Sequence, residues 1–121
     1  MKFTIEGTLP SLNDYIRAER GNKHIAARMK KDNQIYICYC IKKAKIRKAR
    51  GPVRISYTYY EPTRRRDLDN VAAIAHKFVQ DALVAAGVLK NDNWEWVVGF
   101  SDEFHIDNQY PRIEVELTEV K

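Results

Sequence analysis

Alternating apolar and polar residues predict four β-strands along the chain. Residues 2–7 and 53–60 alternate in this way, and the second stretch is rich in β-branched and aromatic side chains. Residues 94–100 are also predicted as a strand, and residues 112–120 alternate between aliphatic and mostly acidic side chains. The carboxyl-terminal part of the chain therefore predicts two successive strands.

Helical spacing of apolar residues predicts two helices. The first extends from about 25 to 49, where Lys and Arg surround an apolar stripe, and Gly51-Pro52 follows it. The second extends from about 70 to 86, with Gly87 at the position that often follows a helix. Residues 8–15 contain proline and turn-forming polar residues, which favour a loop.

The predicted order of elements is β-α-β-α-β-β. This order is typical of a compact mixed α/β domain, here covering residues 1–121, with mostly antiparallel pairing possible at the carboxyl-terminal end. A chain of 121 residues with 45% apolar residues suits one folded domain.

Composition excludes several classes of protein. No apolar run reaches the roughly 18 residues of a membrane helix, and the first residues lack the apolar segment of a secretion signal. The two cysteines, Cys38 and Cys40, are too few and too close to staple a small secreted domain. We therefore expect a cytoplasmic protein that does not contact membranes.

The net charge of +5 is distributed unevenly along the chain. Residues 1–66 hold 17 Lys and Arg against 5 Asp and Glu, whereas residues 67–121 hold 4 against 11. A half-chain of this basicity can attract a nucleic acid through its phosphates. Two solvated faces that neutralise each other would give the same count.

Asp67 and Asp69 are candidate metal ligands. They lie two residues apart between a predicted strand and a predicted helix, so an extended backbone would direct both carboxylates to one side. Such oxygen ligands suit Mg²⁺ or Mn²⁺. Capping of the helix by Asp69 or Asn70 is the alternative. The preceding Arg64–Arg66 would bind phosphate or merely balance the aspartates.

A third carboxylate, Asp92, follows the predicted second helix. The rise of a straight helix places it about 25 Å from Asp69. It could join Asp67 and Asp69 only through a chain reversal, a neighbouring subunit or a strand that returns along the helix.

Other residue patterns carry weaker signals. Cys38 and Cys40 would face different ways on a helix, which argues against a zinc site. Three strand tyrosines could stack on bases, although packing in the core is the commoner role; they are Tyr57, Tyr59 and Tyr60. Trp94 and Trp96 are expected in the core or in a subunit contact.

The segment Arg64-Arg65-Arg66-Asp67-Leu68-Asp69-Asn70 resembles the RusA family of Holliday-junction resolvases. The similarity extends to Leu9–Tyr15, to the basic turn Gly21–Ile25, and to Asp81–Gly87 followed by Asn91-Asp92. The resemblance implies a homodimeric endodeoxyribonuclease of bacterial or prophage origin. Such an enzyme nicks two strands of a four-way DNA junction symmetrically in recombination and repair, using Mg²⁺ or Mn²⁺ and no small-molecule cofactor.

The resemblance also implies roles for individual residues. Asp67, Asp69 and Asp92 would be the catalytic, metal-binding carboxylates. The family commonly has a lysine four residues after the second aspartate, where this chain has Ala73, so Lys77 would take the role from one turn further along. The residues expected to bind DNA are Lys23, Arg28, Lys30, Lys31, Arg64, Arg65 and Arg66. A nucleic-acid-binding module without catalysis is the alternative.

Overall fold

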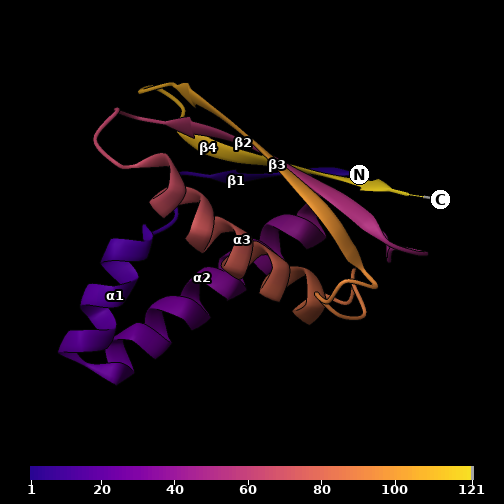
Figure 1. The fold of residues 1–121 in the computed structure, drawn as a ribbon, viewed down its shortest axis with the longest axis horizontal. Helices are drawn as coiled ribbons and strands as arrows, with labels where there is room; N and C mark the ends of the chain where they lie inside the picture. Colours follow the sequence, from indigo (N-terminus) through magenta and orange to yellow (C-terminus); the bar gives the residue numbers. More distant parts are fainter. Residues whose placement is uncertain (121) are drawn as a thin grey trace.

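The computed structural model describes residues 1–120, in which three helices lie on one side of a four-stranded sheet (Figure 1). In chain order the elements are β1 (Lys2–Glu6), α1 (Leu12–Gly21), α2 (Lys23–Lys43), β2 (Val53–Glu61), α3 (Leu68–Ala85), β3 (Val97–Ile106) and β4 (Arg112–Glu119). The predicted class, a single mixed α/β domain, is confirmed. The order is β-α-α-β-α-β-β, with one helix more than predicted.

The strands lie in the order β1-β4-β2-β3, which leaves β3 at an edge of the sheet. β4 pairs antiparallel with both β1 and β2, as the prediction for the carboxyl-terminal end requires. β3 instead pairs parallel with β2, so that Val53 lies opposite Val97 and Glu61 opposite Ile106. The parallel pairing arises because the chain crosses from β2 to β3 through α3.

The core lies between the sheet and the helices. Alternate residues of β2, including Ile55, Tyr57 and Tyr59, are buried on the helix side, and α3 buries a continuous apolar face against them. Burial raises the pKa of the Tyr57 hydroxyl above its ordinary value. Tyr60 points to the other face, where it stacks on the His105 ring. Tyr57 and Tyr59 therefore belong to the core, which is the commoner of the two roles considered for the strand tyrosines.

Residues 8–11 form a loop as predicted, but helix α1 begins at Leu12 and replaces the rest of the loop predicted at residues 8–15. The Ser11 hydroxyl accepts a hydrogen bond from the Asp14 amide (3.2 Å), and the Asp14 carboxylate accepts one from the Ser11 amide (3.0 Å). This reciprocal pair starts the helix. The prediction was wrong because Ser, Asn and Asp favour turns and helix starts for the same reason, their short hydrogen-bonding side chains.

Two other boundaries differ from the prediction. Helix α2 ends at Lys43 instead of 49, because Lys45 adopts a left-handed backbone (φ 56°). Strand β3 begins at Val97 instead of 94, because residues 94–96 form a turn in which the Asn93 carbonyl accepts hydrogen bonds from the Trp96 and Val97 amides. Helix α3 and β2 lie close to their predicted ranges.

The two tryptophans have different surroundings. Trp96 is half-buried and packs against the core, as expected. Trp94 is 94% exposed and contributes nothing to the core of this copy. Among the helices described in residues 1–120, none has the length and apolarity needed to span a membrane.

Candidate active site

Asp67 and Asp69 lie at the start of α3 with both side chains exposed. Asp67 occupies the position just before the helix and has an extended backbone (φ −68°, ψ 140°), but its carboxylate makes no capping hydrogen bond. Asp69 lies in the first turn, where its carboxylate accepts a hydrogen bond from the Asn70 amide (3.0 Å). Capping of the helix by Asp69 or Asn70 is therefore not observed: the residue before the helix is Asp67, and its exposed side chain makes no capping hydrogen bond.

A buried ion pair fixes the segment that leads to Asp67. The Arg66 guanidinium binds both carboxylate oxygens of Glu61, at 3.0 and 3.1 Å, and donates a third hydrogen bond to the Leu9 carbonyl (2.7 Å). Glu61, the last residue of β2, is only 6% exposed. Paired contacts of this kind hold a fixed geometry. Arg66 thus ties together the end of β2, the loop before α1 and the approach to α3.

Glu61 was not among the residues predicted for the site. The signal was present: it is an acidic residue at an inward-facing position of an alternating strand, five residues before an arginine. A buried carboxylate requires a charged partner, so that spacing predicts an ion pair with the arginine run.

A hollow of about 590 Å³ lies beside Asp67. Its apolar part comes from α3 and the end of β3, and its polar rim from the arginine segment. The lining residues are Glu61, Thr63, Arg64, Arg66, Asp67, Leu68, Phe104, His105 and Ile106. Arg64 and Arg65 are exposed, so both guanidinium groups are accessible next to the carboxylates.

Asp92 lies at the opposite end of the molecule from Asp67. It lines a different hollow, with Val97 and Phe100 at the start of β3, whereas Asp67 lies by the end of β3. The 18 residues of α3 lie between the two aspartates, and at 1.5 Å per residue the rise of that helix is about 27 Å.

One copy of the chain does not form the three-carboxylate metal site. Across residues 1–120, no three His, Cys, Asp or Glu side chains are close enough together to hold a metal ion. Asp67 and Asp69 thus lie together at the start of α3, and Asp92 lies apart from them.

The sequence was compared with known proteins. The model of the family described as Endodeoxyribonuclease RusA matches residues 9–118 of this chain. The chain belongs to the RusA family. The match includes the arginine–aspartate segment and the Asp92 loop, and it identifies the protein as an endodeoxyribonuclease of the Holliday-junction resolvase family. A search of curated proteins gave no match.

The lysine of the RusA pattern has no direct counterpart in the structure. Ala73, which occupies its position, is exposed. The Lys77 ammonium lies 3.6 Å from the Asp81 carboxylate, which also lies 3.6 Å from the Lys30 ammonium of α2. At 100° per residue, Lys77 is turned about 80° around the helix from Asp69. Lys77 therefore points along the helix surface toward Asp81.

His76 is the basic residue of α3 that lies in line with Asp69, two turns further along. Its Nε2 lies 2.8 Å from Asp102 of β3, and the same carboxylate oxygen accepts a hydrogen bond from the Tyr59 hydroxyl (2.7 Å). The His76 ring also stacks on Phe100. This cluster joins α3 to the edge strand, and the sequence analysis did not find it because its members lie on three separate elements.

The basic residues predicted to bind DNA lie on two parts of this RusA fold. Lys23, Arg28 and Lys31 are exposed on the amino-terminal half of α2, which projects with α1 away from the sheet (Figure 1). Helix α1 begins at Leu12, three residues after Leu9, whose carbonyl binds Arg66, so this helical pair is tied to the segment that leads to Asp67. Within residues 1–120, exposed basic side chains therefore lie both on the helical pair and at Arg64 and Arg65, next to Asp67 and Asp69.

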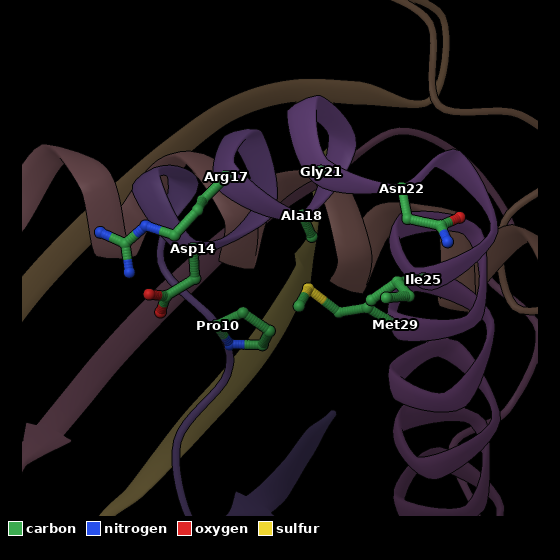
Figure 2. A pocket seen from close by; sticks show the side chains of 8 residues that line it. All are labelled: Pro10, Asp14, Arg17, Ala18, Gly21, Asn22, Ile25 and Met29. Carbon is green, nitrogen blue, oxygen red and sulfur yellow. The ribbon is translucent and has the colours of Figure 1, made fainter.

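A second hollow, of about 650 Å³, separates α1 from α2. Figure 2 shows Ile25 and Met29 of α2 facing Ala18 and Pro10, with Asp14 and Arg17 along one side. None of the three predicted catalytic aspartates lines this hollow. It is an open surface groove between the two helices, in which Ile25 is 56% exposed, and it is separate from the carboxylates.

Proposed function

We propose that this protein is a divalent-metal-dependent endodeoxyribonuclease that resolves four-way DNA junctions by paired symmetric nicks in recombination and repair. The observation that carries the proposal is the state of Asp67 and Asp69. Both carboxylates are exposed beside two accessible arginines, and the Asp67 side chain makes no capping hydrogen bond. In a chain of the RusA family, this is the combination expected of a phosphodiester-cleaving site.

The active protein is proposed to be a homodimer, because a single copy keeps Asp92 away from the other two aspartates. β3 is an edge strand that starts near Asp92 and ends near Asp67. If a second copy adds its β3 antiparallel to the first, the start of one strand lies beside the end of the other. Two equivalent sites then form, each with Asp67 and Asp69 of one copy and Asp92 of its partner.

The three carboxylates would provide oxygen ligands for Mg²⁺, with Mn²⁺ as a substitute. A divalent ion bound there would supply charge neutralisation for the phosphate and lower the pKa of a nearby water. Arg64 and Arg65 would bind the adjacent phosphates and orient the strand. Lys77 could assist only after exchanging Asp81 for a phosphate, since the two form an ion pair.

The projecting helices would hold the arms of the junction. Lys23, Arg28 and Lys31 are exposed, and Arg17 and Arg20 add positive charge on the neighbouring helix. Contacts from such side chains to phosphates position DNA without reading its sequence.

The test uses a labelled four-way junction and a linear duplex of matched sequence, with Mg²⁺, Mn²⁺ or EDTA. We expect paired nicks on the junction only, and only with a metal. Asp69→Asn should abolish cleavage while junction binding in EDTA stays within about threefold, because one charge of many is changed. Asp32→Asn, at an exposed position on α2, is the matched control and should cut as wild type does. Cleavage by Asp69→Asn would refute the assignment.

A nucleic-acid-binding module without catalysis is the second candidate. One observation favours it, namely that the three aspartates do not meet within one copy. In that case the junction assay would give binding that weakens strongly with salt and no nicks with any metal.

A further inference from the structure

Trp94 is the most exposed large apolar side chain in the described residues, with 94% of its surface accessible. It lies in the turn just before β3, two residues after Asp92. Tryptophan is enriched among the residues that contribute most to protein interfaces, and a side chain this exposed is available for such a contact. The position therefore indicates a contact with another protein surface.

The hollow beside Asp67 is an apolar receptor at the other end of the same strand. Leu68 and Ile106, which line it, are 54% and 49% exposed, and Phe104 forms part of its wall. At about 590 Å³ it is large enough to accept an indole ring. Its rim carries the guanidinium group of Arg64, which favours aromatic and acidic groups, beside the Glu61–Arg66 pair and Asp67.

The open edge of β3 connects the two features. Its backbone groups on the free side have no strand partner, and Phe100 and Val98 are exposed along it. Antiparallel pairing with an identical strand would bring the Trp94 end of one copy to the Leu68 end of the other, twice, about a two-fold axis.

We propose that Trp94 of each copy docks into the hollow lined by Leu68, Phe104 and Ile106 of a second copy. The proposal rests on the proposed function for its dimer and adds the residue that sets the register of the interface. Because Trp94 lies two residues from Asp92, its docking carries Asp92 of that copy toward Asp67 and Asp69 of the other. Trp94 is thus a positioning residue for the site.

Charge complementarity supports a second copy as the occupant. The turn that carries Trp94 also carries Asp92 and Glu95, both exposed, and the side chains of Arg64 and Arg65 are exposed at the hollow and next to it. The pairing would place these acidic groups against Arg64 and Arg65 of the other copy. Both sides of the contact are therefore supplied by this chain.

Sedimentation equilibrium of the full chain tests the proposal. Trp94→Ala is expected to raise the dimer dissociation constant by about 30-fold or more, the loss typical of a central interface residue. Tyr39→Ala removes another exposed aromatic side chain, on α2, and should leave it unchanged. A wild-type chain that stays monomeric, or a Trp94→Ala dimer as tight as wild type, would overturn the proposal.

Fluorescence provides a second test that does not depend on Trp94→Ala. In Trp96→Phe, Trp94 is the one remaining tryptophan. Its emission should shift to shorter wavelength as protein concentration passes through the dissociation constant, and Leu68→Arg should prevent the shift. A dimer with Trp94 emission unchanged from the dilute chain would contradict the docking.

The two proposals fail separately. A dimer with shielded Trp94 that cuts no DNA would sink the nuclease proposal and support the docking. Metal-dependent junction cleavage by a Trp94→Ala protein that remains a tight dimer would support the nuclease proposal and overturn the docking.

Discussion

The carboxylate of Glu61 is one of the few charged groups buried in this protein, and its single arginine partner precedes the candidate catalytic aspartate. An ion pair at this place does more than balance charge. It fixes the direction in which the chain leaves β2, and therefore the direction from which Asp67 enters α3. Arg66 was expected to bind DNA, and its side chain is instead engaged with Glu61 and the Leu9 carbonyl.

Removal of Arg66 should reveal the strength of this pair. Arg66→Ala leaves the Glu61 carboxylate buried without a partner, so we expect the free energy of unfolding to fall by about 3–5 kcal/mol. Urea unfolding followed by circular dichroism measures the change. Arg64→Ala, next to it but exposed, should change stability by less than about 0.5 kcal/mol. Similar values for the two variants would show that the pair contributes little.

At the scale of the element, α1 shows how a few hydrogen bonds determine a helix that packing alone would not secure. None of its residues is buried, although Tyr15 contacts Phe78 edge-on. Its start depends on the mutual bonds of Ser11 and Asp14. The hydrogen bond from the Ser11 amide holds the pKa of the Asp14 carboxyl below its ordinary value of 3.8, with Arg66 and Arg17 also lowering it.

This lowered pKa predicts a pH dependence. The carboxylate form stabilises the fold, so its contribution is complete above about pH 4 and is lost as pH falls through the lowered pKa of Asp14. Asp14→Ala should therefore reduce the free energy of unfolding by about 1 kcal/mol at pH 7, and the difference from wild type should shrink toward pH 2. Urea unfolding at both pH values measures it. Asn13→Ala, on the same helix, is the control, and its difference from wild type in the free energy of unfolding should be equal at pH 7 and pH 2. If Asp14→Ala also showed an equal difference at the two pH values, the carboxylate hydrogen bond would not contribute to stability.

The sequence predicted elements best where one periodicity dominates. β2 and α3 each have a regular apolar face over many residues, so their ranges are nearly right. β3 is different, since as an edge strand it needs no continuous apolar face, and Ser101, Asp102 and Glu103 lie in its middle. The apolar residues Trp94, Trp96, Val97 and Val98 placed the predicted strand too early, at residues where the backbone turns.

The candidate site could be predicted only in part for a related reason. Asp67 and Asp69 are neighbours in sequence, so spacing sufficed to find them. The Glu61–Arg66 pair and the His76–Asp102 contact join different elements, and their formation depends on the sheet order β1-β4-β2-β3. Without the parallel pairing of β2 and β3, no local pattern places His76 beside Asp102.

At the scale of the whole molecule, a site shared between two copies predicts a specific pattern of complementation. Asp69→Asn and Asp92→Asn should each be inactive alone. When mixed and allowed to exchange, they form dimers in which one of the two sites has only intact residues. About a quarter of the wild-type sites should then be restored, and they should make single nicks. Nicked and doubly cut junctions separate on denaturing and native gels.

The matched control mixes Asp69→Asn with Asp67→Asn. Both changes fall in the same half of the shared site, so every dimer lacks an intact site and no cleavage should return. Recovery in this control, or none in the first mixture, would contradict a site built across the dimer.

The placement of Asp92 and Asp67 at opposite ends of β3 has a consequence for the cell. A monomer would hold the two parts of the active site too far apart to act together, and it would not cleave DNA at any metal concentration. Cutting would begin only when the protein concentration is high enough for dimers to form, and each dimer would contain two active sites. The cellular concentration of the protein would then control whether the enzyme is active.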